Sequence, residues 1–396
     1  PRDMTPDCSQ TWQVQAHTSP HGIQPEHWNA LLMGSAAPTP FMRHEWLSAL
    51  HDSACASPAT GWSPLFLSAH APGDALDAPP RGVCALYLKN HSRGEYVFDW
   101  AWADAYQRHG LAYYPKLLCA SPFTPVPGSR LLASSPETRV MLLQAMTQYA
   151  RAQGLSSAHV LFPDEADREA AQAQGWLIRH GVQFHWRNRV DSPYVDLPDF
   201  LASLQRDKRK KIQQERRRVA DAGVQVQARL GTDIRPQDWD FFYHCYRNTY
   251  LAHSGPPYLS REFFAQVAQR LSDHWLMFTA SREGQPVAAS LVGVDLAQGV
   301  AWGRYWGCIE PIDCLHFELC YYAPLSWCIA QGFQRFEGGA QGEHKMARGL
   351  MPEPTCSAHW LADPRFAGAV EDFLAQEGAG ISAYVDELKE HSPYKG

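Results

Sequence analysis

The amino-acid sequence predicts an α/β protein made of two related halves, each a twisted mixed sheet flanked by helices. The first indication is length, because 396 residues exceed what one hydrophobic core usually organises. The second is composition: 45% hydrophobic and 19% charged residues, with 14 Trp, 16 Tyr and 17 Phe, allow sizeable cores. The third is an internal repeat, since one order of strands and helices can be followed twice along the chain.

The first copy of the repeat begins with three β-rich runs and continues with a helix that stops at Gly154. A strand, a polar Ala-rich helix and a last strand follow it. The expected strands are residues 65–70, 82–89, 95–100, 158–162 and 182–187, and the expected helices are 136–153 and 164–174.

The second copy has the same order, and its helix stops at Gly332. The expected strands are residues 275–281, 286–294, 299–306 and 334–337, with a helix at 316–331. Two short strings also recur in order: residues 152–154 match 330–332, and residues 183–186 resemble 357–360. Three strands, a helix, a strand and a final strand is the core order of the GNAT acyltransferase fold, so two GNAT-like domains are predicted.

The expected domains are an N-terminal extension at residues 1–40, a first GNAT-like domain at 41–190 and a second at 191–396. The second domain includes a charged helix at residues 199–222 and a strand at 224–230, after a boundary near Asp191 marked by prolines.

Charge and cysteine content exclude several classes of protein. A formal charge of −6 argues against a surface that attracts nucleic acid everywhere, and no DNA partner is expected. The 10 Cys form no CxxC pair, no leader-like segment opens the chain at Pro1, and no apolar run reaches the ~18 residues of a spanning helix. Reduced thiols and a cytoplasmic protein are expected, although a trimmed terminus would hide a signal.

One dense positive stretch, residues 206–218, holds eight basic and two acidic residues. On a helix its apolar residues fall near one stripe, so the charges project outward. The stretch is interpreted either as a solvated helix between domains or as a surface for phosphates of CoA, a nucleotide-linked substrate or tRNA. The candidate phosphate or RNA contacts are Lys208, Arg209, Lys210, Lys211, Arg216 and Arg217.

A glycine-rich motif, residues 336–349, directly follows the strand that is predicted after the second helix. Glycines let the backbone approach a ligand, and acylation of an amine needs a base, for which Glu343 and His344 are suitable residue types. A surface turn with solvated charges is the alternative interpretation. The other candidates, for substrate binding, are Glu337, Gln341, Lys345 and Arg348.

Two aromatic segments, residues 303–308 and 315–322, lie around the start of the second helix. Their charged residues, Arg304 and Glu318, are expected either to pair with each other or to face a cleft. Glu318 is a further candidate catalytic residue. The candidate substrate contacts are Arg304, Tyr305, Trp306, Tyr321 and Tyr322. A zinc site is not predicted, because the spacing of Cys308, Cys314, His316 and Cys320 matches no common zinc site, and packing is the expected role of these thiols.

In the first half, a proline-rich stretch lies just before the helix, where a GNAT domain carries its pyrophosphate loop. It has prolines in place of the usual glycine pair. An equal alternative to a phosphate-binding loop is therefore that the prolines only stiffen the connection. The candidate substrate contacts here are Tyr114, Lys116, Thr124 and Arg130.

Several long strings, among them RDKRKKIQQERRR, GRYWG, LHFELCYY and FEGGAQGEHKMARG, resemble the bacterial FemAB-like predicted N-acyltransferases, described as peptidoglycan biosynthesis or recognition proteins. The resemblance spans roughly residues 41–377 and implies a tandem GNAT-like fold, similar to the Fem aminoacyltransferases that use aminoacyl-tRNA. It supplies no catalytic residue, so the site residues above rest on their own chemistry.

The predicted function is transfer of an acyl or aminoacyl group onto an amine, in a cleft between the halves. Acyl-CoA or aminoacyl-tRNA is the expected co-substrate, with no tightly bound cofactor and no metal, and the acceptor is expected to be a small-molecule or peptide amine. A non-catalytic module that recognises a cell-wall precursor or peptide is the alternative, because a fold does not guarantee its chemistry.

Overall fold

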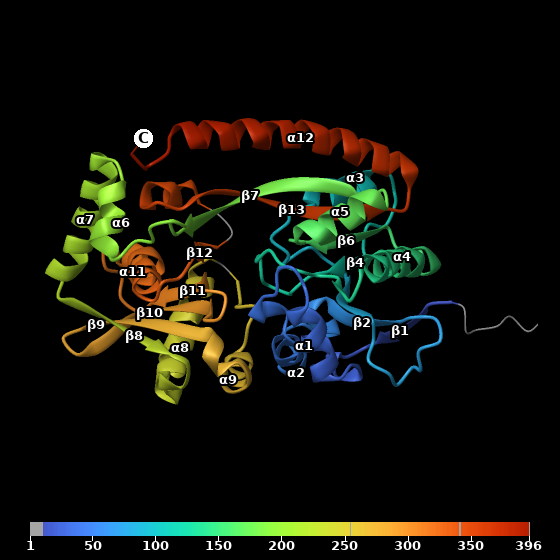
Figure 1. Cartoon of the computed structure of the whole chain (residues 1–396), viewed down its shortest axis with the longest axis horizontal. Helices are drawn as coiled ribbons and strands as arrows, with labels where there is room; N and C mark the ends of the chain where they lie inside the picture. The colour runs from blue at the N-terminus through green and yellow to red at the C-terminus, as the bar shows by residue number, and fades with distance from the viewer. Residues whose placement is uncertain (1–10, 254, 340–341, 396) are drawn as a thin grey trace, which may run out of the picture. The chain divides into compact units, whose positions relative to one another are not determined.

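The computed structural model describes residues 11–253, 255–339 and 342–395 (Figure 1). The chain forms two compact units that divide between His180 and Gly181. A later segment, Thr355–Ala379, returns to unit 1, while Gly380 and the residues after it belong to unit 2. This division differs from the predicted boundary near Asp191.

Unit 1 contains a mixed sheet in the order β1-β2-β3-β4-β6-β13, with β5 added to β3. All neighbours are antiparallel except β4 and β6. Its strands are β1 (Gln13–His17), β2 (Trp62–His70), β3 (Gly82–Lys89), β4 (Lys116–Cys119), β5 (Leu132–Ala133), β6 (Ser157–Leu161) and, from Thr355 on, β13 (Met351–Leu361). Its helices are α1 (Pro25–Met33), α2 (His44–Asp52), α3 (Trp100–Arg108), α4 (Pro136–Ala152), α5 (Glu165–Ala173) and the first part of α12 (Pro364–Glu390).

The main core of unit 1 lies between this sheet and α4. Ser135 caps the helix by accepting a hydrogen bond from the backbone N–H of Thr138, and Pro136 occupies its first turn. Leu142 and Met146 on one face of α4 are fully buried against the sheet. Residues 13–33 of the predicted N-terminal extension form β1 and α1 of this unit.

Unit 2 contains a mixed sheet in the order β7-β12-β11-β10-β9-β8, in which only β11 and β12 are parallel. Its strands are β7 (Leu177–Arg187, from Gly181 on), β8 (Val224–Leu230), β9 (Trp275–Arg282), β10 (Gln285–Asp295), β11 (Val300–Cys308) and β12 (Arg335–Glu337). Its helices are α6 (Leu197–Ser203), α7 (Arg206–Asp221), α8 (Pro236–Ala252), α9 (Arg261–Arg270), α10 (Leu315–Phe317), α11 (Ala323–Ala330) and the end of α12.

The two units have the predicted GNAT-like order of strands and helices. In each, a helical segment connects two parallel strands that pair over three residues: β4 with β6 in unit 1, and β11 with β12 in unit 2. The last strand of each repeat completes the other unit, because β7 pairs with β12 and β13 pairs with β6. The recurring strings 183–186 and 357–360 lie on these two exchanged strands.

Two element predictions are wrong in detail. Residues 95–100 are not a strand: residues 95–99 form a connection and Trp100 begins α3. The strand that follows β2 and β3 in the sheet is β4 instead. The reason is that Glu95 and Asp99 are drawn to the buried amine of Lys116. The charged helix predicted at 199–222 is two helices, because Leu204 is extended and the N–H of Gln205 donates to the carbonyl of Pro393.

Helix α8 packs so closely on β11 that Gly307 has no room for a side chain. A Cβ at Gly307 would lie 1.9 Å from the carbonyl oxygen of Cys245, which is backbone and cannot rotate away. We expect Gly307→Ala to lower the free energy of unfolding by about 2–3 kcal/mol through overpacking, measured by urea denaturation. The matched variant Gly303→Ala, whose Cβ would meet the Phe336 ring at 3.3 Å, should cost clearly less; equal losses would contradict this account.

Candidate active site

Three segments of unit 2 that the sequence singled out come together in one group of polar side chains. They are α7, the π-helix Glu318–Tyr322 and the loop 342–349, which contains the 3-10 helix Glu343–Arg348. We call this group the polar cluster; its members are Glu215, Arg216, Glu318, Tyr321, Tyr322, His344 and Arg348.

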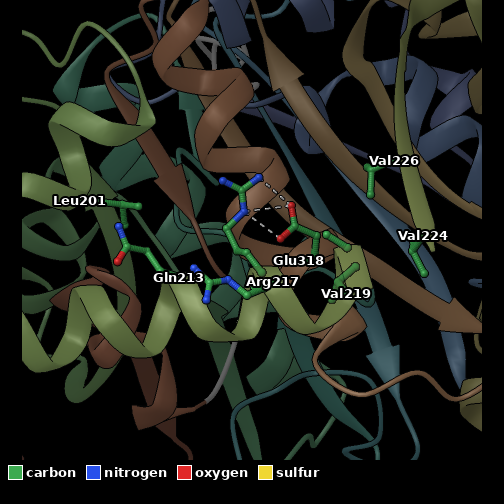
Figure 2. Close-up of a pocket in the computed structure, with 9 residues that line it drawn as sticks. Leu201, Gln213, Arg217, Val219, Val224, Val226 and Glu318 are labelled. Atoms are coloured by element: carbon green, nitrogen blue, oxygen red, sulfur yellow. Dashed lines mark hydrogen bonds and ion pairs between the residues drawn. The ribbon is translucent and has the colours of Figure 1, made fainter. Parts of the chain in front are cut away.

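Two ion pairs hold the polar cluster together. Arg348 Nη2 lies 3.1 Å from both carboxylate oxygens of Glu215, and the two side chains are 3% and 9% exposed. The hydroxyl of Tyr322 donates to the same carboxylate. Arg216 contacts Glu318 through two nitrogens at 3.0 Å (Figure 2). The basic helix is therefore fastened to both other segments.

The local sequence explains why these side chains point inward. Pro324 lacks a backbone N–H, so it cannot make the usual helical hydrogen bond, and the chain before it winds as a π-helix between α10 and α11. Glu215 on α7 lies on the same stripe as the buried Ile212 and Val219. A charge on an otherwise apolar stripe is buried with the stripe and needs a partner, which Arg348 supplies.

His344 lies at the exposed side of the polar cluster. Its Nε2 is 3.2 Å from the hydroxyl of Tyr321, and its carbonyl accepts a hydrogen bond from Arg348 Nη1 at 2.6 Å. Burial, with Arg348 and Lys345 adding to it, lowers the pKa of the imidazole below its ordinary value. His344 is therefore neutral at pH 7 and able to accept a proton.

The buried side chain of Lys345 anchors the loop. Its side chain is 3% exposed, and Nζ donates to the carbonyl of Gly339 at 3.1 Å. Burial lowers the pKa of this amine to about 8, with Cys320 opposing the shift. Gly342 can only be glycine here, because its φ is +119° and a Cβ would clash with the His344 ring.

An open groove of about 720 Å³ borders the polar cluster (Figure 2). Its cationic wall belongs to α7 and its apolar floor to β8. The lining residues are Leu201, Gln213, Arg216, Arg217, Val219, Ala220, Val224, Val226 and Glu318. Arg217 is exposed, so the groove offers a positive charge to an anionic ligand beside an apolar surface.

Strand β11 carries a bulge at Arg304. Leu291 of β10 pairs with Tyr305 and Val292 with Gly303, so the register of the two strands skips Arg304. Bulges of this kind re-aim a side chain and are frequent next to active sites. Trp306, two residues later, packs edge-on against His316 at 5.1 Å, and His316 in turn contacts Tyr321.

Other candidates contact side chains outside the polar cluster. Tyr305 packs against Tyr246 and Phe264 of α8 and α9. Glu343 is exposed and accepts a hydrogen bond from Tyr384 of α12. Glu337 lies buried beside His185 and Arg335. Gln341 lies outside the described residues. The remaining basic candidates occupy the first turns of α7: Lys208, Arg209, Lys210 and Lys211.

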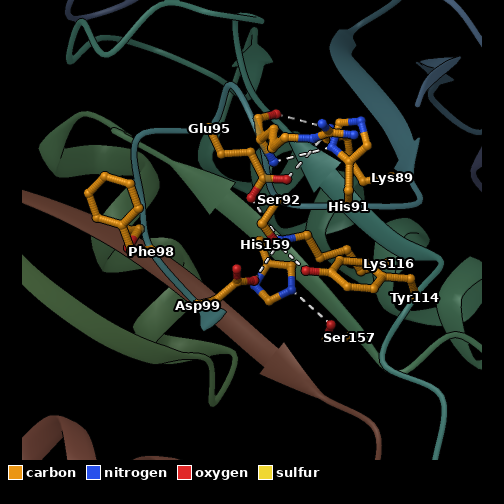
Figure 3. A network of polar contacts seen from close by, with 12 residues as sticks. Lys89, His91, Ser92, Glu95, Phe98, Asp99, Tyr114, Lys116, Ser157 and His159 are labelled. Atoms are coloured by element: carbon orange, nitrogen blue, oxygen red, sulfur yellow. Dashed lines mark hydrogen bonds and ion pairs between the residues drawn. The ribbon is translucent and has the colours of Figure 1, made fainter. Parts of the chain in front are cut away.

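Tyr114 and Lys116 belong to a separate network in unit 1 (Figure 3). Lys116 is 1% exposed and donates to Ser92 at 2.8 Å, Glu95 at 2.7 Å and Asp99 at 2.5 Å. The hydroxyl of Tyr114 is 2.7 Å from Ser92 Oγ. All donors of the Lys116 amine are thus engaged inside the protein.

Thr124 and Arg130 are likewise turned inward. Arg130 is 1% exposed, and its guanidinium donates to the carbonyls of Leu161 at 2.9 Å, Gly128 at 3.2 Å and Val126 at 2.5 Å. Thr124 donates to the carbonyl of Pro122. These contacts fit the alternative in which the proline-rich stretch is a stiff connection.

Three residues of this region were not among the candidates predicted from the sequence. Glu215 anchors Arg348, the Phe317 ring lies 3.6 Å beneath the Arg348 guanidinium, and Tyr384 contacts Glu343. Only Glu215 had a sequence signal, its place on the apolar stripe of α7. Glu318 pairs with Arg216.

The part of the chain that the structure describes contains no group of three metal-ligating side chains. Within the same residues, no helix has the length and hydrophobicity needed to span a bilayer.

Comparisons with solved structures show the fold. FemX superposes with a TM-score of 0.52 and 11% identity, covering 91% of this chain and all of FemX, 100%. The C-terminal domain (DUF2156) of a putative lysylphosphatidylglycerol synthetase from Agrobacterium fabrum gives 0.52 and 9%, covering 88% and 95% of the two chains. L-PGS from Bacillus licheniformis gives 0.51 and 10%, covering 86% and 93%.

Comparison with the curated proteins found no match. The model of the FemAB-like family, described as peptidoglycan biosynthesis/recognition, matches residues 19–396. Since this match extends over nearly the whole sequence, the chain belongs to the FemAB-like family.

Proposed function

We propose that this chain transfers an acyl or aminoacyl group from a phosphate-bearing donor to an amine of a cell-wall precursor or peptide. One observation carries the proposal: the Arg348–Glu215 pair fastens the basic helix α7 to the loop that presents the neutral imidazole of His344. Cations for a phosphate and a proton acceptor are thereby held in one unit. The family description supports a cell-wall acceptor, and a putative lysylphosphatidylglycerol synthetase among the similar folds supports an aminoacyl cargo.

The donor's phosphate is assigned to the groove wall. Arg216 is held by Glu318, whereas Arg217 is exposed on the same wall and can form charge-assisted hydrogen bonds. The apolar floor at Val224 and Val226 would receive the uncharged part of the ligand.

The reaction then requires that the two substrates are oriented correctly and that one proton is transferred from the amine. The amine nitrogen attacks the donor's carbonyl carbon, a C–N bond forms, and the bond to the leaving oxygen or sulfur breaks. His344 takes the proton that the nitrogen must lose, and the hydroxyl of Tyr321, in contact with His344 Nε2, can pass it to the leaving atom. Positioning of the two substrates supplies most of the remaining acceleration.

The test begins with the donor. Purified protein is titrated with CoA, acyl-CoA, tRNA and aminoacyl-tRNA while its thermal stability is followed, and transfer of a labelled acyl group is then assayed on amines of cell-wall precursors and peptides. An aminoacyl-tRNA donor predicts binding with a steep salt dependence, whereas an acyl-CoA donor predicts stabilisation by CoA alone. Precursor binding without transfer would replace the enzyme by a recognition module, and binding of none of these ligands would refute the proposal.

We expect Arg217→Gln to weaken binding of the identified donor by about tenfold, the loss of one charge-assisted hydrogen bond. For an RNA donor, the salt slope should also fall by about one. Isothermal titration measures both. Arg108→Gln, which removes an exposed charge from α3 of unit 1, is the matched control; an equal effect there would show a general loss of charge instead of a groove contact.

A further inference from the structure

The repeat places an ionisable pair at the same position in both units. One member of each pair lies five residues after its matched glycine and is the third residue of the strand that follows the helix: His159 after Gly154 in β6, and Glu337 after Gly332 in β12. Each faces a histidine on the exchanged strand: the registered pairs are His159 with His359 and Glu337 with His185. The structure therefore allows the two pairs to be compared directly.

In unit 1 the two histidines of the pair are fully hydrogen-bonded. His159 Nδ1 and His359 Nδ1 are 2.7 Å apart, His159 Nε2 is 2.8 Å from Ser157, and His359 Nε2 is 2.7 Å from Ser357. All four ring nitrogens thus have a hydrogen-bond partner (Figure 3 shows the His159–Ser157 contact). A fully satisfied neutral pair of this kind stabilises the sheet and has no free position for a ligand.

In unit 2 the corresponding pair is not fully hydrogen-bonded. Glu337 is 5% exposed, and its Oε2 makes no hydrogen bond of normal geometry among the described residues; the Trp302 side chain is the donor beside this carboxyl and helps to lower its pKa. His185 Nε2 is 3.7 Å from that oxygen, too far for a hydrogen bond, and instead contacts Gln183 at 3.2 Å. The other oxygen of Glu337 forms an ion pair with Arg335 at 3.0 Å. A buried carboxylate oxygen without a hydrogen bond of normal geometry is costly and needs an explanation.

The position of Glu337 fits a ligand. Strands β11 and β12 stop pairing after Trp302 and Glu337, and ligands of α/β folds bind where the carboxyl ends of parallel strands part. Gly338 and Gly339 follow, and a Cβ at Gly338 would lie 3.2 Å from the side chain of Lys345. Glu337 is therefore at the root of the loop that carries His344.

The charges around Glu337 suit an exchange of protons. Burial raises the pKa of Glu337 to about 7, against the opposing influence of Arg335. Burial, reinforced by Arg335, Arg187 and Lys345, lowers the pKa of His185 to about 3, so its ring remains neutral. Near pH 7 the carboxyl group can both hold and release a proton.

We propose that Glu337 binds the ammonium form of the acceptor and takes its first proton, and that His185 is a positioning residue for Glu337. This inference rests on the proposed function. The ammonium nitrogen gives a proton to Glu337 Oε2, which leaves a neutral amine and a neutral carboxylic acid. The amine then attacks the donor, His344 receives the second proton, and Glu337 releases the first to solvent, so that protons balance.

The test does not depend on turnover. Protein with ¹³C-labelled glutamate carboxyl groups is titrated by NMR. Burial raises the pKa of Glu95 in unit 1 to about 7 as well, so two glutamate carboxyls are expected to titrate near pH 7 in the wild type, and one of them should be missing in Glu337→Gln. Methylammonium, the probe, should lower the Glu337 midpoint because its N–H groups can donate to the ionised carboxylate, whereas tetramethylammonium, a cation of the same charge without an N–H, should not. His185→Phe should raise the midpoint, since a dipole next to the ion is removed.

Glu371→Gln, which removes an exposed glutamate, is the control and should leave the resonance unchanged. A Glu337 midpoint near that of an exposed glutamate, or no effect of methylammonium, would overturn the inference. In a transfer assay, Glu337→Gln should lower kcat/KM by about 10²–10⁴ and remove the acid limb near pH 7 from its profile. If the wild type acylates no amine, the proposed function is refuted. The titration alone then tests whether Glu337 binds an ammonium group.

Discussion

Replacement of Arg348 by alanine is expected to destabilise unit 2 by about 3–5 kcal/mol, because it leaves the Glu215 carboxylate buried without its charge partner. Arg348 also covers the Phe317 ring and donates to the His344 carbonyl, so the loop 342–349 loses its attachment to α7 and to the π-helix at once. Differential scanning calorimetry should show a transition lowered by roughly 10 °C.

The size of this effect can be separated from general loss of charge. Arg365→Ala removes an arginine whose side chain is 82% exposed and whose pair with Asp363 lies at the surface, so it should cost much less stability than Arg348→Ala. The double variant Arg348→Met with Glu215→Gln removes both charges and should recover part of the stability lost in Arg348→Ala. Additive losses in the double variant would show that the two side chains do not act as a pair.

Much of the fold follows from local sequence. The strands 275–281 and 224–230 could be predicted because β-branched and aromatic residues alternate there between turn signals, and the structure has β9 at Trp275–Arg282 and β8 at Val224–Leu230. The helix beginning at Pro136 was marked by a capping serine, a proline and a following glycine, all of which act within a few residues. Periodicity also placed Ile212 and Val219 correctly on the buried stripe of α7.

The rest depends on partners far away in sequence. No local pattern shows that β13 pairs with β6, or that a connection at residues 95–99 is held by Lys116, because these contacts join segments that are distant along the chain. The site shows the same limit. The sequence found Arg348 and Glu318 but not their partners, and the unsatisfied oxygen of Glu337 appears only when β7 is placed beside β12.

The largest effect on activity is expected for His344→Ala, which should lower kcat by about 10²–10⁴ while the protein stays folded. Burial and the nearby Arg348 and Lys345 keep the pKa of His344 below its ordinary value, so the imidazole is already a proton acceptor at pH 7. His344 is exposed, and among the described residues its ring packs against Tyr321 and Phe317, so its removal should cost little stability. Single-turnover transfer of a labelled acyl group measures the rate of the chemical step.

Three further variants give this prediction a clear outcome. His253→Ala removes another exposed histidine of unit 2 and should leave the rate unchanged. Tyr321→Phe should lower the rate less than His344→Ala, because water can replace a proton relay more easily than a base. Glu343→Gln tests the other predicted base: the carboxylate is exposed and engaged by Tyr384, so we expect a smaller loss than for His344→Ala. The reverse order would move the base to Glu343, and full activity in both variants would leave the reaction without the base that acylation of an amine requires.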